Sequence, residues 1–316
     1  MKNNQPLISI IIPVYNGSNF VKEAIDSALA QTYQNVEVLV INDGSCDDGK
    51  TEEIALSYGD KIRYFHKENG GVSSALNLGI REMKGEYFSW LSHDDKYTET
   101  KIEKQVERLD GERTIVVCTE RQIDKDGEYL TQANDYEALQ KQGAIAWGEE
   151  LSKILKDTLF SGCALLIPKI AFDEAGFFDE DLRYNQDFDM WIRFCLAGFS
   201  WGYNNDVGVL SRVHANQVTQ TRRDLFFHDS YKLGARLIPQ LAEISAKENN
   251  YLYQYAARCA KYDLTENVAL ARKIAKEKKL FSFGQEVTLF FVGLYGKVRP
   301  LIRKVYYALF KKVKTQ

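Results

Sequence analysis

The first hundred residues alternate between short apolar runs typical of buried strands and longer segments whose apolar residues recur with helical period. The runs predict strands at 7–12, 36–41, 61–66 and 86–91. The helical patterns lie between them, at 18–32, 46–58 and 70–83. Pro13 is expected to end the first strand, and Ser18 or Asn19 is available to cap the first helix. Because strands that alternate with helices require right-handed crossovers, the pattern predicts an α/β fold with a mostly parallel central sheet flanked by helices on both faces.

Polar residues able to hold a ligand follow each of the predicted strands. They are Tyr15, Asp43, the loop 69–71, and the adjacent carboxylates Asp94 and Asp95. Ligands bind beyond the carboxyl ends of the strands in such sheets, so these residues are expected at one edge. Two adjacent carboxylates repel each other unless a cation lies beside them, and a divalent metal ion is the commonest such cation. The alternative is that Asp94 and Asp95 only cap the next helix.

The composition is that of a globular protein, and it narrows the function classes. A net charge of -3 over 316 residues gives no general basic surface for nucleic acid. Five cysteines without CxxC spacing argue against a disulfide framework or a zinc site and indicate reduced thiols in the cytosol. The N-terminal apolar run ends in Pro and Asn-Gly without a cleavage site, which predicts a strand and not a signal peptide. No apolar stretch reaches the ~20 residues that a membrane-spanning helix needs.

Two common phosphate-binding loops are missing from the sequence. The turn after the first predicted strand reads PVYNGSNF, which has a single Gly and no GxGxxG pattern, and no GxxxxGK[ST] loop is present. This argues against a dinucleotide site and against a nucleotidyltransferase, which is expected to carry a Gly-rich loop here. Phosphates are therefore expected to be held by side chains together with a divalent ion.

Seven motifs, in order, resemble those of the family 2 glycosyltransferases over about residues 5–217. They read SIIIPVYNG, VLVINDGSCDDG, NGGVSSALNLGI, GEYFSWLSHDD, GCALLIPK, FFDEDLRYNQDFDMWIRF and SRVHANQ. The resemblance implies a GT-A fold with a nucleotide-binding half at about 1–118 and an acceptor-binding half at about 119–220. It also implies a nucleotide-diphosphate sugar as the donor and inversion at the anomeric carbon.

The resemblance assigns Pro13, Tyr15, Asp43 and Asn69 to the nucleotide-sugar site. Tyr15 would pack against the nucleobase, and Asp43 would accept a hydrogen bond from a ring nitrogen. Asp43 lies in the sequence NDGS, so the alternative is that its side chain only forms a local Asx-turn. UDP-galactose, UDP-glucose, UDP-N-acetylglucosamine and dTDP-rhamnose all present a similar pyrimidine and diphosphate, and a UDP-sugar is favoured over a dTDP-sugar.

Asp94 matches the last residue of the family's DxD motif, which binds Mg2+ or Mn2+ bridging the two phosphates. Ser92 stands where that motif begins with Asp, so the ribose contact of the first Asp is weaker or moves elsewhere. Asp95 belongs to the same nucleotide-sugar site, where it shares the metal or orients its waters. His214 resembles the histidine that completes the metal shell, with a purely structural histidine as the alternative, and Arg212 is expected near the diphosphate. A mixed oxygen and imidazole shell suits Mn2+ at least as well as Mg2+.

Asp187 matches the acidic residue that serves as the general base in this family. A sugar hydroxyl is a poor nucleophile until its proton is accepted in the transition state, so the reaction needs such a group. The segment NQDFDMW reads as the start of an amphipathic helix, in which Asp187 has the alternative role of helix cap. Asp189 is the second candidate base, and Gln186 stands where many relatives carry Glu.

Helical patterns dominate the last third of the chain, where 221–286 is predicted to form a helical appendage. Residues 287–316 form a basic amphipathic segment with many basic side chains and no acidic ones. One apolar stripe runs from Val298 to Val313 at helical spacing, and Pro300 predicts that the helix begins close to that residue. Such a helix either docks on the protein's own core or lies on an anionic membrane surface, and the single sign of its charge favours the membrane.

Together these features predict a metal-dependent inverting glycosyltransferase, peripheral at the cytoplasmic face of the cell membrane, that acts on a lipid-linked cell-surface glycan. The predicted order is a GT-A domain at 1–220, the helical appendage at 221–286 and the membrane-associating segment at 287–316. The alternative is a non-catalytic relative that binds nucleotide-sugar or glycan as a partner subunit, and Ser92 is the feature that favours it. No nucleic-acid partner is expected.

Overall fold

The computed structural model of the chain describes residues 5–130, 146–156, 160–214, 223–245 and 249–310. The chain divides into two compact units. The first comprises Met1–Glu150 and Leu159–Arg223, and the second comprises Leu151–Thr158 and Asp224–Gln316. The second unit therefore includes a short segment from within the predicted GT-A domain. Within the described part of the chain, no helix is long and apolar enough to cross a lipid bilayer.

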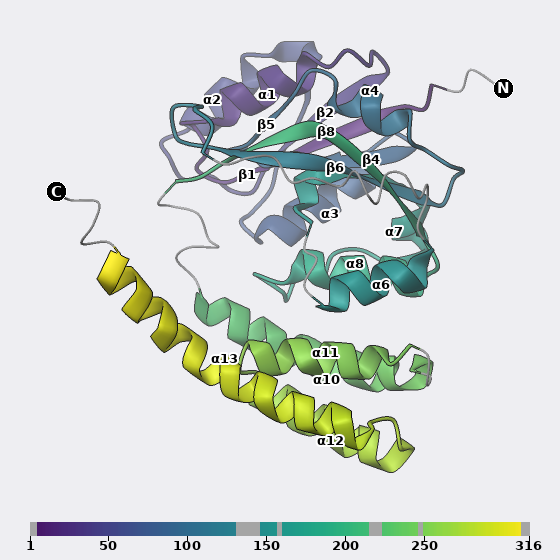
Figure 1. Cartoon of the computed structure of the whole chain (residues 1–316). Coiled ribbons are helices and arrows are strands. Elements are labelled where there is room, and N and C mark those ends of the chain that lie inside the picture. The colour runs from purple at the N-terminus through teal and green to yellow at the C-terminus, as the bar shows by residue number, and fades with distance from the viewer. Residues whose placement is uncertain (1–4, 131–145, 157–159, 215–222, 246–248, 311–316) are drawn as a thin grey trace. The chain divides into compact units, whose positions relative to one another are not determined.

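The first unit is built around one sheet of eight strands (Figure 1). The strands are β1 (Ile8–Val14), β2 (Val36–Asn42), β3 (Arg63–His66), β4 (Tyr87–Trp90), β5 (Lys96–Tyr97), β6 (Thr114–Ile123), β7 (Leu165–Pro168) and β8 (Ser200–Arg212). Their order across the sheet is β3-β2-β1-β4-β7-β6-β8-β5. The first four strands run parallel to one another, as do β6 and β8, whereas β7 and β5 are antiparallel to their neighbours.

Helices cover both faces of this sheet. They are α1 (Val21–Leu29), α2 (Lys50–Leu56), α3 (Val72–Glu82), α4 (Lys101–Val106), α7 (Ile170–Ala175) and α8 (Gln186–Leu196), together with the start of α6 (Trp147–Lys156) and the short turns η1 (Gly59–Lys61) and η2 (Gly162–Ala164). In Figure 1, α1 and α3 lie on opposite sides of the sheet, and both contact β1. This cover explains why all seven residues of β1 are buried. The predicted α/β fold is therefore confirmed.

The parallel strands β1 to β4 end at one edge of the sheet. The register pairs Val14 of β1 with Asn42 of β2, and Asn42 with His66 of β3. On the other side of β1, Ile11 pairs with Trp90 of β4. The residues that follow these strands therefore share one edge, as the sequence predicts: Tyr15, Asp43, the loop 69–71 and the turn 92–95.

Two local predictions about β1 and α1 are wrong. β1 continues one residue beyond Pro13, because β4 pairs with β1 only as far as Ile11 and the missing N–H faces that unpaired side. A proline is tolerated in a strand where its N–H would not enter the hydrogen-bond ladder. α1 begins after Phe20, and neither of the two predicted residues caps it. The main-chain N–H groups of Phe20 and Val21 instead donate to the carbonyl of Gly17.

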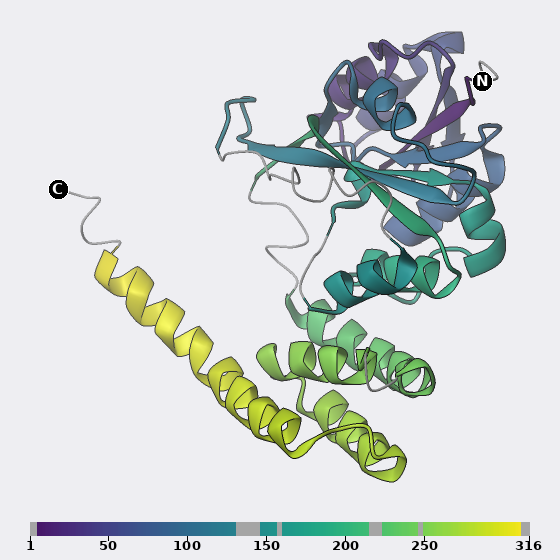
Figure 2. The same ribbon diagram turned by 45° about the vertical axis from the view of Figure 1, so that its right-hand side comes forward.

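The second unit is helical. It contains α10 (Arg223–Ile244), α11 (Tyr251–Lys261), α12 (Thr265–Lys278) and α13 (Phe283–Phe310). α11 and α13 lie side by side in Figures 1 and 2 and contact each other. Leu289 of α13 is buried, and Gly296 approaches α11 so closely that a Cβ at this position would overlap the carbonyl oxygen of Ala260. These contacts anchor the part of α13 that precedes Pro300.

The predicted start of the last helix is wrong. α13 begins at Phe283 and contains Pro300 in its interior. An interior proline removes one main-chain hydrogen bond and costs about 3 kcal/mol. The packing of α13 on α11, which includes the close approach at Gly296, opposes that cost. The side chains of 300–310 and all of 311–316 lie outside the described residues, and so does that part of the predicted apolar stripe.

Candidate active site

The turn after β4 and the end of β8 bring two predicted metal ligands together. Asp94 lies in this turn, where the N–H of Asp95 donates to the carbonyl of Ser92 over 3.1 Å. Nε2 of His214 lies 2.9 Å from Oδ2 of Asp94, although the two residues are 120 positions apart in the chain. Both side chains are 17% exposed, so solvent and ligands reach them. The helix-cap alternative does not apply, because α4 has Thr100 at its N-cap and no side-chain cap bond.

Asp95 and Ser92 have partners inside the protein. Asp95 is buried and accepts a hydrogen bond of 2.8 Å from the main-chain N–H of Arg212. Burial, together with the neighbouring charge of Asp94, raises the pKa of Asp95 well above its usual range. The thiol of Cys163 donates to Oγ of Ser92 over 3.3 Å, and its sulfur accepts the main-chain N–H of Ser92 at the same distance. Asp94 is therefore the carboxylate of this turn that is available to a metal ion.

Asp94 and His214, called the metal pair below, fit a divalent ion in their spacing and their donor atoms. Oδ2 and Nε2 are joined by a direct hydrogen bond of 2.9 Å, a distance that is also close to the separation of about 3 Å between two neighbouring ligands that each lie about 2.1 Å from an octahedral ion. Among the described residues, no three His, Cys, Asp or Glu side chains gather around one point. Two protein ligands would leave the rest of the shell of an ion such as Mg2+ or Mn2+ to substrate phosphates and water.

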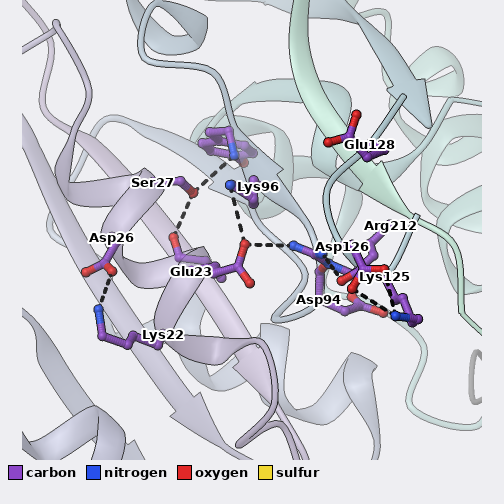
Figure 3. A network of polar contacts seen from close by, with 12 residues as sticks. Lys22, Glu23, Asp26, Ser27, Asp94, Lys96, Lys125, Asp126, Glu128 and Arg212 are labelled. Atoms are coloured by element: carbon purple, nitrogen blue, oxygen red, sulfur yellow. Dashed lines mark hydrogen bonds and ion pairs between the residues drawn. The ribbon is translucent and has the colours of Figure 1, made fainter. Parts of the chain in front are cut away.

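Arg212 is buried beside the metal pair, with 1% of its surface exposed. Its Nε donates to the carbonyl of Asp94 over 3.0 Å, and Nη1 donates to the carbonyl of Lys125 over 2.8 Å. Nη2 donates to Oε2 of Glu23 on α1 over 2.9 Å (Figure 3). The predicted contact of Arg212 with a diphosphate is untested. The observed partners instead give this side chain a role in joining three segments of the chain.

Asp43 lies at the end of the predicted donor site opposite the metal pair, where it holds the loop 69–71 by hydrogen bonds. Its buried carboxylate accepts hydrogen bonds from Nζ of Lys67, at 2.8 Å, and from the N–H groups of Gly70 and Gly71, at 2.9 and 2.7 Å. A carboxylate has about four acceptor positions, so one remains for a ligand. The local side-chain to main-chain hydrogen bond at this point is made by Asn42, whose Oδ1 accepts the main-chain N–H of Ser45 over 2.9 Å. The long-range partners of Asp43 thus differ from those of an Asx-turn.

Tyr15, Asn69 and Pro13 lie at the same end of the site. Tyr15 is 45% exposed, and its hydroxyl lies 3.5 Å from Sγ of Cys46. Nδ2 of Asn69 donates to the main-chain carbonyl of Asp43 over 2.9 Å, and Pro13 is buried in β1. The exposed ring of Tyr15 offers an aromatic surface on which a base can stack.

Asp187 and Asp189 have different environments on the first turn of α8. Asp189 is completely buried, and its Oδ2 lies 2.9 Å from both Nε and Nη2 of Arg193. Asp187 is partly exposed, and its Oδ1 accepts the N–H of the next residue over 2.7 Å. Asn185 occupies the N-cap position and makes no side-chain cap bond, while Oε1 of Gln186 is buried without a hydrogen-bond partner in the described structure. Asp189 is therefore committed to an ion pair, and Asp187 is the more accessible carboxylate.

Four residues that shape this edge have little or no signal in the sequence. Lys67 follows the third predicted strand, and its position at a strand end marks it as a candidate site residue. Phe20 and Glu23 lie in an ordinary amphipathic helix pattern, and no motif marks them. Arg183 donates to the carbonyl of Gly70 over 2.5 Å across 113 positions of the chain. Such contacts depend on the tertiary fold and leave no local pattern.

Comparison with known proteins identifies the family. The family model described as glycosyl transferase family 2 matches residues 9–170, about half of the chain. A Rickettsia typhi protein named as a glycosyltransferase is 52% identical over 227 residues, which cover 70% of this chain and 69% of that protein. This chain belongs to glycosyl transferase family 2. As a family 2 glycosyltransferase it also resembles the hyaluronan synthase of Pasteurella multocida, with 30% identity over 200 residues that cover 62% of this chain and 19% of that protein.

A solved structure has a similar fold. TarS of S. aureus, residues 1–349 in complex with UDP-GlcNAc, superposes with a TM-score of 0.63 at 15% sequence identity. The match covers 90% of this chain and 79% of that chain. At this level of identity the likeness concerns the fold, and it confirms the predicted GT-A fold. The predicted membership of family 2 and the predicted glycosyltransferase class are confirmed as well.

Proposed function

We propose that this family 2 glycosyltransferase uses a divalent ion, Mn2+ or Mg2+, to transfer a sugar from a UDP-sugar to a glycan acceptor with inversion at the anomeric carbon. The observation that carries the proposal is the metal pair. Its two ligand-type side chains come from the ends of β4 and β8 and lie 2.9 Å apart. Both are partly exposed, which a metal completed by substrate phosphates requires.

The arrangement of strand ends supports a nucleotide-diphosphate sugar as the donor. Tyr15 exposes its ring beyond β1, and Asp43 beyond β2 keeps one acceptor position for a base N–H. β4, which leads to Asp94, is the other neighbour of β1, so the base end and the metal end occupy adjacent strands. TarS has been solved with UDP and with UDP-GlcNAc, which favours a UDP-sugar over a dTDP-sugar for a chain of the same fold.

The proposed reaction is a single displacement. When bound, the divalent ion would neutralise negative charge on the departing diphosphate. Asp187 would accept the proton of the acceptor hydroxyl while the acceptor oxygen bonds to the anomeric carbon and the sugar–phosphate bond breaks. Asp189, paired with Arg193, would hold the first turn of α8 and with it Asp187. Attack from the side opposite the diphosphate gives the inverted product.

A thermal-shift screen tests this function. Purified full-length protein is heated with UDP-galactose, UDP-glucose, UDP-N-acetylglucosamine or dTDP-rhamnose, each with Mn2+ and with EDTA. One donor is expected to raise the unfolding temperature in Mn2+ and to lose most of that effect in EDTA, because a ligand stabilises the state to which it binds. The same shift with and without Mn2+ would contradict the metal dependence. No shift with any nucleotide-sugar would contradict the proposed donor class.

The apolar face of α13 supports a peripheral position at an anionic membrane surface, where a lipid-linked cell-surface glycan would be the acceptor. Exposed apolar side chains recur on this face at helical spacing: Phe283, Val287, Phe290, Phe291, Leu294, Tyr295 and Val298. The stripe predicted from Val298 to Val313 continues the same spacing. Beyond Glu286 the chain carries basic residues and no acidic one. An exposed apolar stripe combined with positive charge is typical of an interfacial helix and not of one docked on its own core.

Truncation after Arg299 should weaken binding of the protein to anionic liposomes at low salt while donor hydrolysis continues. The truncation removes Arg303, Lys304, Lys311, Lys312 and Lys314, and each basic residue near an anionic leaflet contributes about 1 kcal/mol. It keeps Leu289 and Gly296, which pack within the helical unit. Co-sedimentation with phosphatidylserine vesicles measures the effect.

The matched control for this truncation neutralises charge on another helix. Lys273 and Lys276 are exposed on α12, and the double Lys→Gln variant should sediment like the full-length protein. A full-length protein that stays in the supernatant at low salt would rule the membrane role out. Equal release of the control and the truncated protein would contradict a specific role of α13, because the control leaves that helix intact.

A further inference from the structure

The start of α1 reaches the metal pair through two side chains that have no role in the reaction proposed above. Oε2 of Glu23 accepts the hydrogen bond from Nη2 of Arg212 at 2.9 Å and lies 3.4 Å from Nζ of Lys96 (Figure 3). The ring of Phe20 lies 4.4 Å from the guanidinium carbon of Arg212 and 5.5 Å from the centre of the His214 ring. One helix terminus thus contacts both the guanidinium and one member of the metal pair.

Arg212 connects the start of α1 to the turn that holds Asp94, the other member of the metal pair. Its Nε donates to the carbonyl of Asp94, and its main-chain N–H donates to Oδ1 of Asp95. Two adjacent residues of the turn are therefore tied to Arg212, which lies two positions before His214 in the chain. A buried guanidinium is costly without a nearby negative charge, and Glu23 supplies one at the end that faces α1.

We infer that Glu23 is a positioning residue for the metal pair. Its carboxylate fixes the guanidinium of Arg212, and Arg212 fixes the turn that carries Asp94. This inference rests on the proposed function, because it assumes that the pair binds a metal ion. The side chain of Glu23 is 45% exposed but the guanidinium with which it pairs is buried, so loss of the carboxylate should also cost some stability. Groups that orient metal ligands typically change metal affinity by about 10- to 100-fold, so loss of Glu23 is expected to lower the affinity for the metal ion.

Calorimetric titration of MnCl2 into the full chain saturated with UDP tests the inference. Glu23→Ala should weaken Mn2+ binding about tenfold, and Glu23→Gln should weaken it less because the amide oxygen still accepts a hydrogen bond from Arg212. Lys22→Ala is the matched control, since Lys22 is the neighbouring residue and pairs at 2.7 Å with Asp26 on the exposed side of α1 (Figure 3). The control should bind Mn2+ like the wild type and unfold at the wild-type temperature. Glu23→Ala should unfold at a somewhat lower temperature, so its titration is run where the variant is fully folded.

The possible results separate this inference from the proposed function. Equal Mn2+ affinity in the wild type and in Glu23→Ala would overturn the positioning role and leave the metal pair as proposed. A wild-type chain that binds no Mn2+ would overturn the metal assignment and the positioning role together. An equal loss of Mn2+ affinity in Glu23→Ala and Lys22→Ala would also overturn the inference, because any change on α1 would then weaken Mn2+ binding.

Discussion

Replacing Asp94 with alanine should abolish Mn2+-dependent donor binding and turnover while the protein stays folded. The side chain supplies one of the two proposed protein ligands, and its loss should weaken Mn2+ binding by more than the roughly 100-fold that outer-shell changes cause. The fold should survive, because the neighbouring segments are held by the Asp94 carbonyl, which the substitution keeps. Removing the carboxylate also removes a like charge beside buried Asp95. His214→Ala should reproduce the loss.

The measurement is calorimetric titration of Mn2+ in the presence of UDP, paired with thermal unfolding. Asp126→Ala is the matched control, since Asp126 is a well-exposed carboxylate in the same region whose ion pair with Lys125, at 2.6 Å, lies at the surface (Figure 3). The control should bind Mn2+ with wild-type affinity. Comparable Mn2+ affinity in the wild type and in Asp94→Ala would remove the metal assignment, whatever happens to turnover.

The sequence predicts the sheet and the edge that carries the site because both follow from local pattern. Apolar runs with helices between them place β1 to β4 within one or two residues of the observed bounds. The rule that ligands bind beyond the carboxyl ends of parallel strands then brings Tyr15, Asp43 and Asp94 to one edge, where the register puts them. Neither prediction depends on which distant segments of the chain are in contact.

Contacts between distant segments are what the sequence leaves open. Arg212 meets Glu23 across 189 positions, and Asp43 takes its hydrogen bonds from a loop 27 and 28 positions away. The role of Arg212 as a buried link follows from its burial, which no motif encodes. Pro300 shows the opposite failure: a strong local rule predicts a helix start there, and packing of α13 on α11 overrides it.

Substitutions can distinguish the roles of the two carboxylates of α8, Asp187 and Asp189. Asp187→Asn should retain donor affinity but lower kcat by about a hundredfold or more, because the amide cannot accept the proton of the acceptor hydroxyl. Asn has nearly the same shape as Asp, so its amide oxygen can still accept the hydrogen bond from the N–H of the next residue. Steady-state kinetics with the donor identified in the thermal-shift screen measures kcat, and titration of UDP measures donor affinity.

Asp189→Asn is the matched control, and its effect should fall on stability. Asp189 is fully buried against Arg193, so removing its charge leaves a guanidinium without its carboxylate partner and should lower the free energy of unfolding by about 3 kcal/mol. The folded fraction should lose much less kcat than Asp187→Asn, because Asp189 acts only by holding the first turn of α8. If Asp189→Asn instead loses kcat without losing stability while Asp187→Asn does not, the roles of the two residues are exchanged. If neither variant changes transfer, a general base on α8 is wrong. A wild type that binds a donor but transfers no sugar to any acceptor would favour the non-catalytic partner subunit.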